Sequence, residues 1–270
     1  MYDHNHLHCD VLVVGGGISG VIAASISSND GNNTVLIDDK NSLGGSTIFQ
    51  DDENFKINDE KSSVWLNNKI KELENKKNLK IKRRTSLAAY HNYNYLLARE
   101  NLADHKSLNE RSNKLRQRLW KIRAKKVILA TGAIERPLIF NNNDRPGVML
   151  ANSVKKYIDY FGVRCGNKNI IFTNNDSAYE TAISLNKKGI NVTIVDIRNN
   201  SSSMLAKNAK DAGIKIYWNH TVVDTKGYRR IKSIQIMKMS EDGTNVIGSK
   251  INLVCDNLSV SGGWTPMVHL

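Results

Sequence analysis

The sequence predicts an α/β protein made of two strand–helix–strand units, with the second unit inserted in the first. Three observations favour this fold class. A β-branched strand over residues 9–14 ends in glycines, and a small-residue helix over 18–28 and a strand over 34–37 follow it. The same order of elements recurs from residue 169. A late apolar strand then runs into a Gly-Gly turn at 262–263, which predicts a return to the first unit.

This order of elements sets the expected domain boundaries. The first domain is expected over residues 8–150, completed by 254–270, and the inserted domain covers 151–253. The hydrophobic pattern of the first domain adds an amphipathic helix and two strands, over residues 64–75, 80–89 and 119–130. In the inserted domain, strands and helices alternate over residues 169–173, 177–189, 191–196, 202–213 and 214–218, and two more strands are expected over 229–239 and 249–254.

Length and apolar content narrow the class of protein. A chain of 270 residues suggests one to two domains. It has no stretch of about 18 uninterrupted apolar residues that could cross a membrane. Its N-terminus lacks a basic region followed by an apolar core, so a cytoplasmic protein with no membrane partner is expected.

The net charge of +13 raises the question of an anionic partner. Basic residues gather over 76–84 and 111–126, but no aromatic platform or nucleic-acid-binding motif accompanies either run. A solvated basic surface is the first expectation and docking to an acidic partner subunit is the alternative. Nucleic acid is not expected as a partner.

Cysteine and histidine placement excludes two kinds of chemistry. Cys9, Cys165 and Cys255 are far apart and none belongs to a CxxC pair, so dithiol redox chemistry is not expected and the thiols are expected to be free. His4, His6 and His8 alternate along an extended segment, but no distant ligand motif completes a metal site, so no metal is expected. No constellation of residues nominates a catalytic group.

The strongest chemical signal is the sequence VLVVGGGISG, followed by VLIDD. Gly15 permits the tight turn after the strand, Gly17 lets the backbone approach a pyrophosphate, and Gly20 lets helix and strand pack closely. The helix N-terminus adds positive dipole. Asp38 ends the next strand, where a carboxylate can accept ribose hydroxyls. This combination predicts dinucleotide binding, and the alternative is a Rossmann-like fold with an empty site.

Three later turns contain small residues. Gly44 and Gly45 lie just past the acidic residue, Thr131 and Gly132 lie in an ATGA segment after a strand, and Ser261, Gly262 and Gly263 form the last turn. In flavoproteins of the glutathione-reductase type such turns gather round one dinucleotide, and the order here resembles that architecture. The fold class is therefore two Rossmann-like dinucleotide-binding folds of this type.

The inserted unit has a degenerate glycine motif. Thr173, Asn174 and Asn175 stand where a nicotinamide-binding domain would carry glycines. Asparagine tolerates the left-handed conformation, so the turn can persist, but close approach of a pyrophosphate is not expected. The second unit is predicted to be a structural scaffold.

A longer stretch carries a more specific resemblance. The segment RLWKIRAKKVILATGAIERPLIFNNNDRPGVMLANSVKKYIDYFGV resembles the α subunit of heterotetrameric sarcosine oxidase, as do YDHNHLHCDVLVVGGG, IIFTNNDSAYETA and LSVSGGWTPMVHL. The resemblance runs nearly from end to end. The ERP and NNDRPGVMLA stretches are much more specific than the glycine fingerprint.

The resemblance implies an oxidoreductase that oxidises sarcosine to glycine with oxygen as acceptor and, with tetrahydrofolate, forms methylenetetrahydrofolate. It implies that this chain holds NAD, with FAD as the alternative, and that FAD and FMN lie on a partner subunit. Partners of β, γ and δ type are expected. Carried over by motif, the NAD site includes Ser19, Asp38, Asp39, Lys40 and Ser46, with Leu87 and residues 261–263 as weaker transfers.

Two departures from the family leave alternatives open. The family's chain has a ferredoxin-like domain before this region and a folate-binding domain after it, and neither is in this sequence, so a fragment without activity of its own is expected. The segment AYHNYNYLLAREN departs from the family pattern and weakens the transfer of Leu87. A subunit of another amine or opine oxidase, another NAD(P)- or FAD-dependent oxidoreductase, and a non-catalytic nucleotide-binding scaffold for assembly are the rival interpretations.

Overall fold

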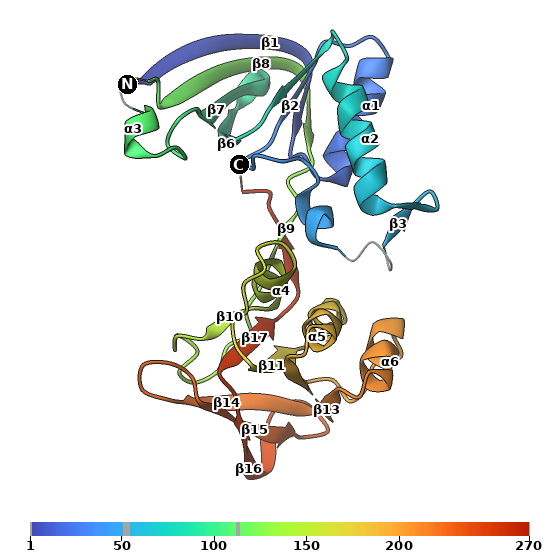
Figure 1. Cartoon of the computed structure of the whole chain (residues 1–270), viewed down its shortest axis with the longest axis vertical. Coiled ribbons are helices and arrows are strands. Elements are labelled where there is room, and N and C mark those ends of the chain that lie inside the picture. The colour runs from blue at the N-terminus through green and yellow to red at the C-terminus, as the bar shows by residue number, and fades with distance from the viewer. Residues whose placement is uncertain (1, 51–54, 112–113, 270) are drawn as a thin grey trace. The chain divides into compact units, whose positions relative to one another are not determined.

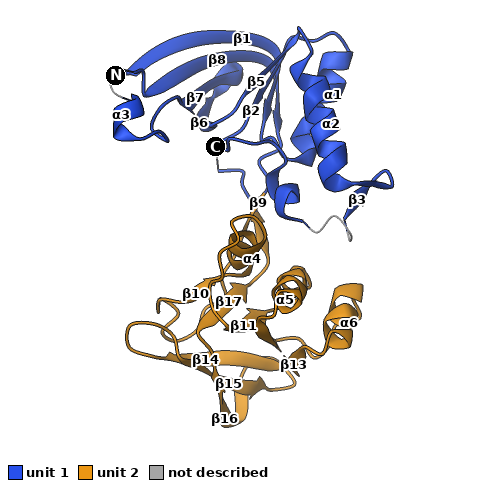
Figure 2. Cartoon of the chain, viewed as in Figure 1, with its two compact units in different colours: residues 1–132, 266–270 blue, residues 133–265 orange. Residues whose placement is uncertain are grey.

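The computed structural model describes residues 2–50, 55–111 and 114–269 (Figure 1). The chain forms two compact units. Unit 1 comprises residues 1–132 and 266–270, and unit 2 comprises the continuous stretch 133–265 (Figure 2). An inserted second unit is therefore confirmed.

Unit 1 is built on a six-stranded sheet with the order β5-β2-β1-β8-β7-β6. Its strands are β1 (Tyr2–Val14), β2 (Thr34–Ile37), β5 (Leu79–Lys82), β6 (Thr85–His91), β7 (Tyr95–Asn101) and β8 (Gln117–Leu129). The β5-β2-β1-β8 part is parallel, and β6, β7 and β8 pair in antiparallel fashion. Helices α1 (Ile18–Asn29) and α2 (Ser62–Glu74) lie on one face of the parallel part (Figure 1).

Hydrophobic residues cover both faces of the parallel strands, which explains their nearly continuous apolar sequence. Val11 and Val13 of β1 pack with Val21 of α1 and Leu66 of α2, in one core cluster. A second cluster on the other face joins residues of β1, β2, β7 and β8. The amides of Asp10 and Val11 both donate to the Asn33 carbonyl, at 2.9 and 3.3 Å. This local irregularity reverses which side chains of β1 face inward, as a bulge does.

Unit 2 is a five-stranded parallel sheet with the order β10-β17-β11-β12-β13. Its strands are β10 (Val148–Leu150), β11 (Lys168–Thr173), β12 (Asn191–Asp196), β13 (Lys215–Trp218) and β17 (Asn257–Ser261). Residues of α4 (Ala151–Asp159), α5 (Ser177–Lys187) and α6 (Met204–Asp211) form the core on one face. On the other face lies the antiparallel sheet of β14 (His220–Lys226), β15 (Ser233–Met239) and β16 (Val246–Val254).

Short elements complete the chain. They are η1 (Gly45–Phe49), β3 (Lys56–Ile57), β4 (Glu60–Lys61), η2 (Asn92–Asn94), α3 (Leu108–Arg111), β9 (Ala133–Glu135) and β18 (Trp264–Pro266).

The observed elements differ from the expected ones in several places, and helix α4 and strand β10 are among those that the sequence did not predict. The single strand expected over 80–89 is two strands, β5 and β6, because the chain turns at Arg84, whose φ is +53°. Strands β7 and β14 lay in segments with no expected strand. Residues 133–150 and 254–265, which were assigned to the first domain, belong to unit 2, because β17 inserts between β10 and β11 and pairs with both. Only residues 266–270 return to unit 1.

Candidate functional site

Gly15 in the turn between β1 and α1, and Gly20 in the first turn of α1, have no room for a side chain. Gly15 has a φ of +103°, and a Cβ there would lie 2.2 Å from the Ala130 carbonyl oxygen. A Cβ on Gly20 would lie 1.8 Å from the Gly15 carbonyl oxygen. These two glycines therefore let strand, helix and the turn after β8 approach one another.

Gly17 is different, because nothing lies within 4 Å of the position that its Cβ would take. Gly17 is the N-cap of α1, and the first helical hydrogen bond runs from the Val21 amide to the Gly17 carbonyl at 2.9 Å. The amides of the first turn have no carbonyl partner within the helix, and that turn carries no acidic residue. Ser19 is exposed in the same turn. The open space and the helix dipole fit a pyrophosphate group.

Asp38 holds the glycine turn in place. It is buried, its Oδ2 accepts from the Gly16 amide at 2.5 Å, and its Oδ1 accepts from the Lys40 amide at 2.7 Å. Burial raises the pKa of the Asp38 carboxyl, and the two backbone amides oppose that rise. A Cβ on Gly16 would lie 2.4 Å from Leu43 and 3.0 Å from the Asp38 carboxylate, so this glycine is also required. The sequence interpretation missed Gly16, although the GGG run was its signal.

Asp39 and Lys40 follow at the surface. Their side chains form an ion pair and are 52% and 55% exposed. Both oxygens of Asp38 accept from backbone amides, so Asp39, whose exposed carboxylate pairs with Lys40, is the one of the two aspartates that a ligand can reach. The Lys40 carbonyl accepts from the Arg84 amide at 2.8 Å, which ties this loop to the start of β6. No sequence signal marked Arg84.

The second glycine turn joins the first. The Gly44 amide donates to the Gly16 carbonyl at 2.7 Å, and Gly17 and Gly44 form an isolated bridge. A Cβ on Gly45 would lie 3.0 Å from the Cα of Gly17. Ser46 is exposed at the start of η1. The structure therefore brings the 43–46 turn against the glycine turn, as the sequence predicted.

The ATGA turn also meets the first turn within unit 1. Gly15 lies against Ala130, because a Cβ on Gly15 would be only 2.2 Å from the Ala130 carbonyl oxygen. Thr131 donates through Oγ1 to the Met267 carbonyl at 2.5 Å, and the Met267 amide donates to the Gly132 carbonyl at 3.0 Å. These bonds hold the returning segment of the chain to unit 1.

Two weaker predictions are not brought into this cluster. The Leu87 side chain packs against the buried cluster on the other face of the sheet. Ser261 ends β17, Gly262 and Gly263 follow it, and all three residues belong to unit 2. A role for them in holding a nucleotide stays a prediction.

The turn of unit 2 is closed by its own side chains. Asn174 and Asn175 are not among the described residues with positive φ, so the turn persists without the left-handed conformation that asparagine tolerates. Instead, Asn175 Oδ1 accepts from the Ser177 amide at 3.2 Å and from the Ser177 hydroxyl at 2.6 Å. Asn175 Nδ2 donates to the Ser261 carbonyl and hydroxyl, at 3.2 and 3.1 Å. The side chain of Asn175 thus occupies the N-terminus of α5.

The acidic residue that ends β12 is also engaged. Asp196 is fully buried, accepts from the Tyr179 hydroxyl at 2.8 Å and pairs with Arg198 at 2.8 Å. Arg198 also pairs with Asp176, the N-cap of α5, at 2.8 Å. The hydrogen bond to Asp196 raises the pKa of Arg198, although burial opposes the rise. A nucleotide phosphate at this turn would therefore meet the Asp176 carboxylate.

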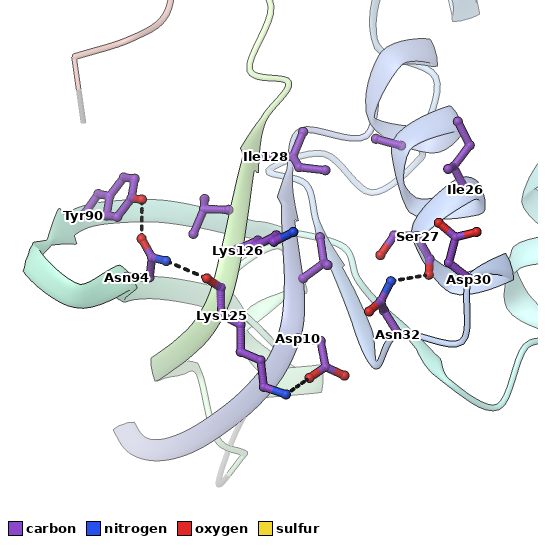
Figure 3. A pocket seen from close by; sticks show the side chains of 13 residues that line it. Asp10, Ile26, Ser27, Asp30, Asn32, Tyr90, Asn94, Lys125, Lys126 and Ile128 are labelled. Carbon is purple, nitrogen blue, oxygen red and sulfur yellow. Dashed lines mark hydrogen bonds and ion pairs between the residues drawn. The ribbon is translucent and has the colours of Figure 1, made fainter.

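A groove of about 830 Å³ lies elsewhere in unit 1, between the C-terminal half of α1 and β8 (Figure 3). Asp10 and Lys125 pair across one side of it at 2.7 Å, and Ile26, Ser27 and Asp30 of the α1 end line the other. It lies at the C-terminal half of α1, whereas Gly17 lies at the N-terminus of that helix. Since it contains no helix N-terminus or glycine turn, it is not assigned to the nucleotide.

The three cysteines form no disulfide and do not lie together at the strand–helix turn of either unit. All three cysteines are free, and Cys9 and Cys255 are buried in the cores of different units. Within the described part of the chain, no group of three or more His, Cys, Asp or Glu side chains has the geometry to hold a metal ion. The described helices include none long and apolar enough to cross a membrane.

The double Rossmann fold with one glycine-rich turn defines the class. The chain belongs to the pyridine nucleotide-disulphide oxidoreductase family, whose model matches residues 9–269. It belongs to this family although its sequence has no pair of neighbouring cysteines.

Within that class, the chain is similar over its whole length to sarcosine oxidase subunit alpha. It is 35% identical to the subunit from Corynebacterium sp. (strain P-1), 36% to that from strain U-96, and 32% to that from Rhizobium meliloti (strain 1021). All of this chain is covered in each case, but it spans only 28%, 28% and 26% of those relatives.

Solved structures share the fold. The thioredoxin reductase of Lactococcus lactis matches 96% of this chain and 78% of its own with a TM-score of 0.70 at 18% identity. The L-proline dehydrogenase of P. horikoshii matches 97% of this chain and 43% of its own with a TM-score of 0.66 at 21% identity. The predicted fold of two Rossmann-like units is confirmed.

Proposed function

We propose that this chain is the NAD-binding region of an α-type subunit of a sarcosine oxidase-like complex. The observation that carries the proposal is the cluster of three turns around Gly17, whose open space fits a pyrophosphate, in a chain 35% identical to such a subunit. The complex would oxidise sarcosine to glycine with oxygen and tetrahydrofolate. FAD and FMN would lie on a β-type partner, with γ- and δ-type subunits completing it.

Residues of unit 1 would hold the nucleotide. The backbone at Gly17 and the first turn of α1 would bind the pyrophosphate, and Asp39 would accept the ribose hydroxyls. A carboxylate at this position repels a 2′-phosphate, so NAD is favoured over NADP. Asp38 would act as a positioning residue, because it holds the Gly16 and Lys40 amides. NAD would be an accessory cofactor, with the electron transfer carried by the partner.

The nucleotide that the purified chain carries tests the proposal. We expect denaturation to release NAD, identified by mass, from a colourless preparation. A yellow preparation that releases FAD would replace NAD by its alternative, and a preparation that neither carries nor binds any dinucleotide would contradict the site. Oxidation of opines but not sarcosine by the assembled complex would favour another amine oxidase.

A further inference from the structure

A strongly basic surface lies on the outer side of the β1-β8-β7 sheet, away from the nucleotide turn. Strand register places its residues in rows. His4, Leu119 and Arg99 form one row, His6, Lys121 and Leu97 the next, and His8, Arg123 and Tyr95 the third. Side chains alternate between the faces of a strand, and the opposite face carries buried residues such as Leu7, Trp120 and Ile122. We call the outer residues His4, His6, His8, Arg99, Lys121 and Arg123 the basic face.

The charges of the basic face are not neutralised by the chain itself. Across residues 2–50, 55–111 and 114–269, no carboxylate pairs with Arg99, Lys121 or Arg123. The neighbouring Arg118, which alternates to the other face, does have a partner, in Asp3 at 2.9 Å. Asp10, the next carboxylate along β1, is already paired with Lys125. Lys121 and Arg123 lie two residues apart on the same face of β8, and an anionic partner would offset the repulsion between their charges.

The basic face is also ordered before any partner binds. The Arg123 guanidinium lies 4.6 Å from the centre of the Tyr95 ring, and Tyr95 stacks on His91 at 5.8 Å between ring centres. A guanidinium held in this way presents its donors as a planar fork that matches a carboxylate. Less side-chain freedom is then lost on binding.

We propose that the basic face docks an acidic surface of a partner protein. Tyrosine and arginine are enriched in protein interfaces, whereas binding of nucleic-acid bases needs aromatic rings with open faces. The Tyr95 ring is already contacted by Arg123 and His91. Carboxylates on a protein are therefore favoured over a nucleic acid. The inference rests on the proposed function only in that the chain works as a subunit.

A matched pair of charge-reversal variants tests the location of this surface. Fluorescence anisotropy would measure binding of labelled poly-L-glutamate to the full chain and to Lys121→Glu/Arg123→Glu. The control is Lys207→Glu/Lys210→Glu, which changes two exposed lysines of α6 and alters the net charge by the same amount. We expect Kd to rise about tenfold or more in the first variant and much less in the control.

A milder variant, the retained nucleotide and a second probe complete the test. Lys121→Gln/Arg123→Gln replaces the Glu variant if that variant fails to fold, and is expected to weaken binding to a smaller extent. Every variant should retain its nucleotide, which separates this test from that of the proposed function. Equal losses in the test and control variants would overturn the proposal. Tighter binding of oligo-dT than of poly-L-glutamate, lost in the basic-face variant alone, would replace the acidic protein by a nucleic acid.

Discussion

At the scale of single residues, the three glycines of the fingerprint differ in the space around them. Gly15 and Gly20 have backbone atoms where a Cβ would lie, whereas Gly17 faces open space. The sequence fingerprint treats the three alike. The structure shows that the fold needs Gly15 and Gly20, whereas Gly17 leaves the open space where we propose that the pyrophosphate binds.

A pair of alanine substitutions tests this division. Gly17→Ala should change the free energy of unfolding by less than about 1 kcal/mol, because its extended backbone accepts alanine, but should weaken NAD binding. Gly20→Ala should destabilise the chain by about 3 kcal/mol, because its methyl group would meet the Gly15 carbonyl. Denaturant unfolding and calorimetric titration with NAD measure the two effects. Equal losses of stability in both variants would refute the separate roles.

The thiols of Cys9 and Cys255 should react more slowly with an alkylating agent in the native chain than in the denatured chain. Burial raises the pKa of Cys9 to about 11 and that of Cys255 to about 12, with smaller contributions from Asp10 and Asp256. Both therefore stay protonated as the pH rises through 8. Brief alkylation of the native chain at pH 8 should modify neither, whereas in denaturant all three react. Peptide mass analysis measures this, and native modification of Cys9 would show that its burial is wrong.

At the scale of elements, the helices begin in different ways. The N-cap side chain of α6 makes a capping bond, because Ser203 Oγ accepts from the Ala206 amide at 3.2 Å. Ser203→Ala should lower the free energy of unfolding by about 1 kcal/mol. The adjacent, exposed Ser202 is the control, and its replacement by alanine should change stability by less than about 0.5 kcal/mol. Chemical denaturation that finds equal effects would exclude the cap as the cause.

Helix α5 begins at a turn that should not bind a nucleotide even if glycines are restored. In the variant Asn174→Gly/Asn175→Gly, the carboxylates of Asp176 and Glu180 remain near the first turn, and Asp196 remains bound to Tyr179 and Arg198. Calorimetric titration should therefore find the same number of bound nucleotides per chain as before the change. One additional NAD per chain would show that the asparagines alone close the second turn.

At the scale of the whole molecule, unit 2 is continuous in sequence and has a complete set of layers. Its parallel sheet has helices on one face and the β14-β15-β16 sheet on the other, and each face has its own core. A chain of residues 133–265 should fold alone with a cooperative thermal transition and should not bind NAD. Circular dichroism and calorimetry would measure both properties. A non-cooperative transition would mean that unit 2 depends on unit 1.

The sequence by itself determined the class of the fold and the position of the first glycine turn. Period-two and helical hydrophobic patterns are local, and a tight turn requires glycine because of contacts between a few neighbouring atoms. Both features can therefore be predicted from the sequence. The lack of glycines in the TNND turn could be recognised from the sequence for the same reason.

Only the tertiary structure decided the remaining features. Strand β17 could have extended either sheet, and its pairing with β10 and β11 moved residues 254–265 into unit 2. The division between Asp38, which holds backbone amides, and the open Asp39 depends on which side chain turns inward after β2. Both outcomes come from contacts between residues far apart in the chain, where no local pattern states which partner a strand or a carboxylate meets.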